Sequence, residues 1–145
     1  MAKTSAKAKT AYELLERVCA HIKAKPQTYL QERFIATGDQ AHEYGLHPPC
    51  GTAACRAGWI VALHDGPLDP RDYGGIQTRA NAILGLDSQT TGDLFSGAAL
   101  NCGLDAIDFM VKPGTAAYVR AGVRGLRSFM KRHAAHLKAR KLDGV

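Results

Sequence analysis

Several features that mark common protein classes are missing from this sequence of 145 residues. No run of about 18 consecutive apolar residues occurs, so we expect no membrane-spanning helix. No apolar stretch of signal-peptide length follows the basic N-terminus, which favours a cytoplasmic protein. Glycine-rich phosphate loops, paired carboxylates and a Ser-His-Asp arrangement are also lacking. The sequence therefore gives no positive indication of an enzyme or of a bound cofactor.

The chain lacks the cysteine density of a disulfide-rich scaffold, and it has a single tryptophan. The four cysteines are an even number, but in a reducing compartment that parity is weak support for disulfides. Apolar residues make up 46% of the chain and charged residues 22%, which is an ordinary globular composition. A chain of this length buries enough surface to hold a core without metals or disulfides. We expect one folded domain.

Helical patterns dominate the chain. Thr10 and Glu13 form a capping box, and an apolar stripe spaced by three and four residues then runs until Lys25-Pro26 stops the helix. Further helices are predicted from Thr52 to Leu63, from Ile76 to Leu84 and from Ser88 to about Phe95. A short apolar segment, 104–111, is also assigned to a helix. The predicted fold is all-α, a compact helical bundle with a flexible basic tail over residues 1–9 and a single helical domain over 10–145.

The last predicted helix is the most strongly charged part of the chain. It starts after Thr115 and runs to about Lys141. Residues 113–145 hold eight basic and one acidic side chain, so the net charge of +6 comes from this end. One edge of the helix is basic, about 27 Å long at 1.5 Å per residue. Its five members are Arg120, Arg124, Arg127, Lys131 and Lys138.

The second distinctive stretch contains Cys50, Gly51, Thr52, Cys55 and Trp59. Its simplest interpretation is structural, with a glycine turn, a threonine N-cap and thiols packed around the tryptophan. Two chemical alternatives remain open. Cys55 in the first turn of a helix is placed to have a lowered thiol pKa, and His47, Cys50 and Cys55 offer an incomplete zinc set.

The chain resembles a group of uncharacterised small proteins of bacteria and their phages and prophages. The resemblance rests on Cys50-Gly51-Thr52-x2-Cys55-x-Ala57-Gly58-Trp59, supported by segments around His21 to Phe34, Ala82 to Phe95 and Ala121 to Phe129. It implies a phage or prophage setting, and it supplies no catalytic residues.

These observations together predict a non-enzymatic binding or accessory protein that engages an anionic partner through the basic C-terminal helix. The candidate partners are DNA or RNA, because cationic side chains neutralise phosphates, and an acidic protein. A thiol or zinc centre at Cys50 and Cys55 is the alternative function.

Overall fold

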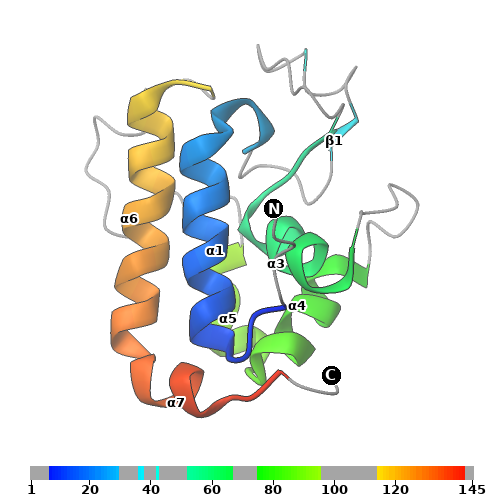
Figure 1. The fold of residues 1–145 in the computed structure, drawn as a ribbon, viewed down its shortest axis with the longest axis vertical. Helices are drawn as coiled ribbons and strands as arrows, with labels where there is room; N and C mark the ends of the chain where they lie inside the picture. The colour runs from blue at the N-terminus through cyan, green and yellow to red at the C-terminus, as the bar shows by residue number, and fades with distance from the viewer. Residues whose placement is uncertain are drawn as a thin grey trace.

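The computed structural model describes residues 7–29, 36–37, 42, 52–66, 75–95 and 114–142, and it confirms the all-α prediction (Figure 1). The helical elements are α1 (Ala11–Ala24), the 3₁₀ turn η1 (Pro26–Thr28), α3 (Arg56–Asp65), α4 (Ile76–Leu84), α5 (Ser88–Phe95), α6 (Ala116–Arg132) and α7 (Ala134–Ala139). α1 packs against α3, α6 and α7, and α3 packs against α4. α1 and α6 lie side by side and run in opposite directions (Figure 1).

The first helix forms as its sequence predicts. The Thr10 hydroxyl accepts a hydrogen bond from the Glu13 amide at 3.1 Å, and the chain leaves the helix at Lys25, before Pro26. The six apolar residues of the predicted stripe are all buried, namely Ala11, Leu14, Leu15, Val18, Cys19 and Ile22. The second half of the capping box differs, because the Glu13 carboxylate accepts from the amide of Lys9 rather than from Thr10.

The helix after the cysteine motif starts later than predicted. Thr52 is not its N-cap, because Thr52–Ala53 forms the short strand β2, which pairs antiparallel with β1 (Ala36–Thr37). Cys55 occupies the N-cap position of α3, and Gly66, at φ 108°, ends the helix. Backbone hydrogen bonds to β1 hold Thr52 in a strand, so Thr52 does not cap the helix. The prediction of a threonine N-cap was wrong because it considered only residues close to the helix in sequence.

α4 and α5 follow the predicted boundaries. Gly85 adopts the left-handed conformation at φ 69° and closes α4. The Asp87 carboxylate accepts from the Thr90 amide at 2.8 Å at the start of α5. At the end of α3, Arg79 reaches back from α4 and holds Asp65 through two hydrogen bonds of 2.6 and 2.8 Å. The Asp65–Arg79 pair joins α3 to α4, and the Thr91 hydroxyl on α5 donates to the Asn81 side chain on α4 at 2.6 Å.

The predicted C-terminal helix is divided in two. α6 ends at Arg132, and α7 begins at Ala134 after a break at His133. The break turns α7 towards α4, where His136 donates to the Leu84 carbonyl at 2.9 Å. Arg140, just beyond α7, donates to the Ala82 and Ile83 carbonyls at 2.8 and 3.2 Å. These donors bind carbonyls of the last turn of α4, and the Ala82 carbonyl also accepts from the Gly85 amide.

The two ends of the described chain are joined by backbone hydrogen bonds. The Ala11 amide donates to the Arg140 carbonyl at 2.9 Å, and the Leu142 amide donates to the Lys9 carbonyl at 3.0 Å. Ala8 is buried beside them. The folded body therefore takes in residues 8 and 9, which the sequence had placed in the N-terminal tail.

Candidate anionic-partner interface

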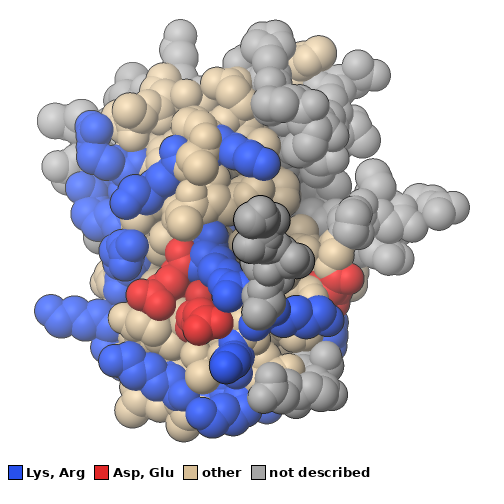
Figure 2. All heavy atoms as spheres, viewed as in Figure 1, with Lys and Arg blue, Asp and Glu red and all other residues tan. Residues whose placement is uncertain are grey.

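α6 is an amphipathic helix whose charge is entirely positive. The Thr115 hydroxyl caps it by accepting from the Tyr118 amide at 3.2 Å, as predicted. The face turned inward is apolar and includes Val119, Val123, Leu126 and Phe129. The 17 residues of the helix include four members of the predicted basic edge, a further arginine at position 132, and no acidic side chain. Figure 2 shows Lys and Arg gathered along the side of the molecule where α6 lies, with acidic groups over α1.

The basic edge is shorter than predicted. Arg120, Arg124, Arg127 and Lys131 are all exposed on α6, and they span about 17 Å at 1.5 Å per residue. Lys138 does not continue this edge, because the break at His133 places it on α7. Its ammonium group lies 4.8 Å from the centre of the Tyr12 ring, a cation–π contact with α1. Lys138 therefore serves the packing of α7 on α1 and lies apart from the other four cations.

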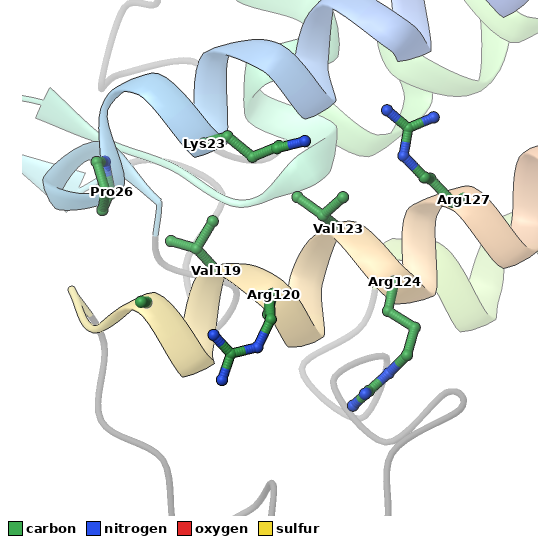
Figure 3. Close-up of a pocket in the computed structure, with 8 residues that line it drawn as sticks. Lys23, Pro26, Val119, Arg120, Val123, Arg124 and Arg127 are labelled. Carbon is green, nitrogen blue, oxygen red and sulfur yellow. The ribbon is translucent and has the colours of Figure 1, made fainter.

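A groove of about 520 Å³ opens between α6 and the end of α1 (Figure 3). Its apolar lining comes from Pro26, Ala116, Val119 and Val123. Among the described residues, its charged lining is cationic and consists of Lys23, Arg120, Arg124 and Arg127. Val119 and Val123 point from α6 towards α1 in Figure 3, and Lys23 extends from α1 along the groove. Three of the five predicted binding residues thus line one concave feature.

A second, shallower hollow of about 410 Å³ adjoins this groove and shares Lys23 and Arg127 with it. Its remaining lining comes from α1 and consists of Glu16, Ala20 and Ala24. Ala20 and Ala24 are exposed and have small side chains, so the surface of α1 is recessed at this point. The seam between α1 and α6 is therefore strongly cationic at the end near Pro26, and it carries a carboxylate towards the other end.

Tyr29 and Arg56 fix α6 at close range to the rest of the domain. A Cβ atom built on Gly122 would lie 2.4 Å from Cε2 of Tyr29 and 2.6 Å from its hydroxyl oxygen, so only glycine allows this approach. The Gly122 carbonyl accepts from Nη1 of Arg56 at 3.1 Å, and the Arg56 side chain is buried. The Tyr29 ring lies 5.2 Å from that of Tyr118, centre to centre. These contacts hold α6 against the end of η1 and the start of α3.

The tryptophan of the cysteine motif has a structural role. Nε1 of Trp59 donates to the Thr28 carbonyl at 2.7 Å, and the same carbonyl accepts from the Ala54 amide at 2.9 Å. The ring lies 4.1 Å from that of His21, centre to centre. Burial lowers the pKa of His21, and Lys25 adds to the shift. Trp59 therefore ties α3 to η1 and to the end of α1, the end that forms the groove.

Cys55 has the properties of a packed thiol. It is 1% exposed, and burial raises its pKa to about 11, although amides of the first turn of α3 oppose the shift. Desolvation thus outweighs the helix terminus, and the thiol is protonated at neutral pH. In the part of the chain that the structure describes, no three His, Cys, Asp or Glu side chains gather as a metal site. Cys50, Gly51 and His47 lie outside the described residues, so the alternative centre at Cys50 and Cys55 stays a prediction.

The groove arginines could be predicted from the sequence, but the groove itself could not. Lys23 and Pro26 belong to it although they lie about 90 positions before Arg120 in the sequence. Val119 and Val123 belong to the apolar face of α6, and at 6% and 8% exposure they form the floor of the groove. The sequence did indicate that Lys23 is exposed, because it lies outside the apolar stripe of α1. It also placed Lys23 close to Pro26, at the end of that helix.

None of the described helices has the length and apolar character needed to cross a membrane. No family model, curated protein or solved structure matches the chain. The resemblance based on the cysteine motif therefore stays a prediction. A proposal for the function has to rest on the geometry of the α1–α6 groove.

Proposed function

We propose that this protein is a non-enzymatic binding or accessory protein that engages an anionic partner through α6 and the adjoining end of α1. One observation carries the proposal: Lys23, Arg120, Arg124 and Arg127 line a single groove, and no acidic side chain is among its described lining residues. The phage or prophage setting belongs to the same proposal and rests on the motif resemblance alone.

The electrostatics of the surface support an anionic partner. Like charges held close together on one helix repel one another, so a bound anion relieves the repulsion as well as adding attraction. Arginine suits such a site because its planar guanidinium group binds carboxylate or phosphate through two parallel hydrogen bonds. The exposed positions of these side chains mean that the attraction falls as salt concentration rises.

The test is a binding titration with two labelled polyanions, a short duplex DNA and a polyglutamate peptide, at low and near-physiological salt. We expect salt-sensitive binding of at least one polyanion by the wild type. The charge-reversal variant Arg120→Glu/Arg124→Glu/Arg127→Glu should lose that binding and keep its far-UV circular dichroism spectrum. Absence of binding to both polyanions at low salt contradicts the proposal.

A matched control uses cations away from the groove. Lys7→Glu and Lys141→Glu change two exposed side chains near the joined ends of the described chain. This double variant should bind nearly as well as the wild type, because neither side chain lines the groove. Equal losses in the control and in Arg120→Glu/Arg124→Glu would mean that net charge, and not the groove, determines binding.

A further inference from the structure

The groove on α6 is more than a patch of positive charge, because its base is apolar. Val119 and Val123 are 6% and 8% exposed, and the small exposed surface they retain faces the groove. Pro26 and Ala116 extend this apolar base at the end nearest the start of α6. A polyanion without apolar groups would neutralise the rim and leave the base in contact with water. The lining therefore favours a ligand that is both acidic and apolar.

The spacing of the cations matches a helical ligand. Arg120, Arg124 and Arg127 are separated by four and three residues, so they lie along one edge of α6 over about 10 Å. Two turns of a partner helix present carboxylates at the same spacing. α1 and α6 already pack in antiparallel directions, and the seam between two helices is a common seat for a third amphipathic helix.

The described lining fits nucleic acid less well. Proteins that hold single strands stack bases on exposed aromatic rings, and the aromatic residues of α6 near the groove, Tyr118 and Phe129, are 4% and 1% exposed. None of the described residues that line the groove is aromatic. A sugar–phosphate backbone is mostly polar and offers little aliphatic surface to cover the valines. The combination of valine base and arginine rim thus favours a protein ligand over a phosphate backbone.

We propose that the partner is an acidic amphipathic helix of another protein, with aliphatic or aromatic side chains on Val119 and Val123 and carboxylates on Arg120, Arg124 and Arg127. This inference rests on the proposed function and names its partner class. The alanine-lined hollow beside Lys23 extends the proposed binding surface along α1, and Glu16 lies at the other end of this hollow. The bound helix carries its carboxylates opposite the three arginines and a neutral or basic residue opposite Glu16.

Two tryptophan variants separate the apolar base from the charged rim. Ala116 is exposed and lines the groove, so Ala116→Trp fills the groove without changing its charge or entering the core. Ala135 is an exposed alanine on α7, outside the groove, so Ala135→Trp is the matched control. Equal thermal midpoints for the two variants and the wild type establish that any difference in binding comes from the groove.

The probe is a displayed library of random peptides long enough for about three helical turns. Peptides are selected on the wild type, with counter-selection on Ala116→Trp. We expect recovered sequences with Asp or Glu and with Leu, Ile or Phe at helical spacing. A synthetic peptide of this kind should bind wild type and Ala135→Trp equally, and Ala116→Trp at least about tenfold more weakly. Arg120→Gln/Arg124→Gln should cost about tenfold as well, since exposed ion pairs contribute modestly.

Two results overturn the inference. Selection that yields no acidic amphipathic sequences, while duplex DNA binds wild type and Ala116→Trp equally, assigns the surface to nucleic acid and leaves the proposed function standing. Equal binding of the recovered peptide and a scrambled peptide of the same composition shows that charge alone acts. A wild type that binds neither peptides nor DNA at low salt contradicts the proposed function itself.

Discussion

Replacing Gly122 by alanine tests whether α6 is held where the structure places it. In an ordinary helix interior, this change stabilises a protein by about 1 kcal/mol, because alanine has the higher helix propensity. At Gly122 the new Cβ would lie 2.4 Å from Cε2 of Tyr29, a residue with no exposed surface. Overpacking of this kind costs about 1–3 kcal/mol. The contact is severe and involves a buried ring, so the cost lies near the upper end of that range.

The net effect of Gly122→Ala is therefore a loss of about 1–2 kcal/mol in unfolding free energy. Gly92 on α5 supplies the control, because a Cβ atom there meets nothing within 4 Å. Gly92→Ala should stabilise the protein by up to about 1 kcal/mol. With a shift of roughly 3 °C in Tm per kcal/mol at this chain length, the two variants should move Tm in opposite directions.

The assay is thermal and urea unfolding of both variants and the wild type, followed by far-UV circular dichroism. A Gly122→Ala protein as stable as Gly92→Ala would refute the close approach of α6 to Tyr29. The position of the groove valines would be contradicted as well, since they lie on the same two turns of α6 as Gly122.

Three further predictions concern contacts elsewhere in the domain. Trp59→Phe should cost about 1 kcal/mol, measured by urea unfolding, because it removes the 2.7 Å hydrogen bond to the Thr28 carbonyl; an unchanged stability would contradict that bond. Cys55, with its pKa raised to about 11 by burial, should resist iodoacetamide at neutral pH until the protein unfolds; site-resolved mass spectrometry showing labelling at the rate of a free thiol would restore the thiol alternative. Hydrogen bonding by Arg79, followed by that of His64, lowers the pKa of Asp65 to about 2, so its stabilisation is present above the ordinary value of 3.8 and is lost as pH falls through 2. Arg79→Gln should therefore be less stable than wild type near neutral pH, by no more than about 1 kcal/mol for so exposed a pair, and the difference should close towards pH 2; a constant difference would refute the assignment.

Local signals in the sequence predicted most of the helices. The stripe from Ala11 to Ile22 is buried throughout, and Gly66, Gly85 and Thr115 end or begin helices as their chemistry indicates. These features depend on residues a few positions apart, which a sequence displays directly.

The errors arose where distant parts of the chain meet. His133 is neither glycine nor proline, and the helix breaks there because His136 and Arg140 reach the carbonyl end of α4, some 50 positions earlier. Thr52 pairs with a strand that no local pattern predicted. The groove likewise joins the end of α1 to α6, so the arginines could be named from the sequence but the valine base and Lys23 could not.

The most direct test of the central claim is an NMR titration of the isotope-labelled protein with the polyanion or peptide that binds most tightly. At 15.6 kDa the chain gives resolved amide spectra. The largest amide shifts should fall on Lys23 and on residues 116–127 of α6, with small shifts at Lys138 and around Cys55. Shifts centred on α3 and Cys55, or spread over the surface without a maximum at α6, would contradict binding at the groove.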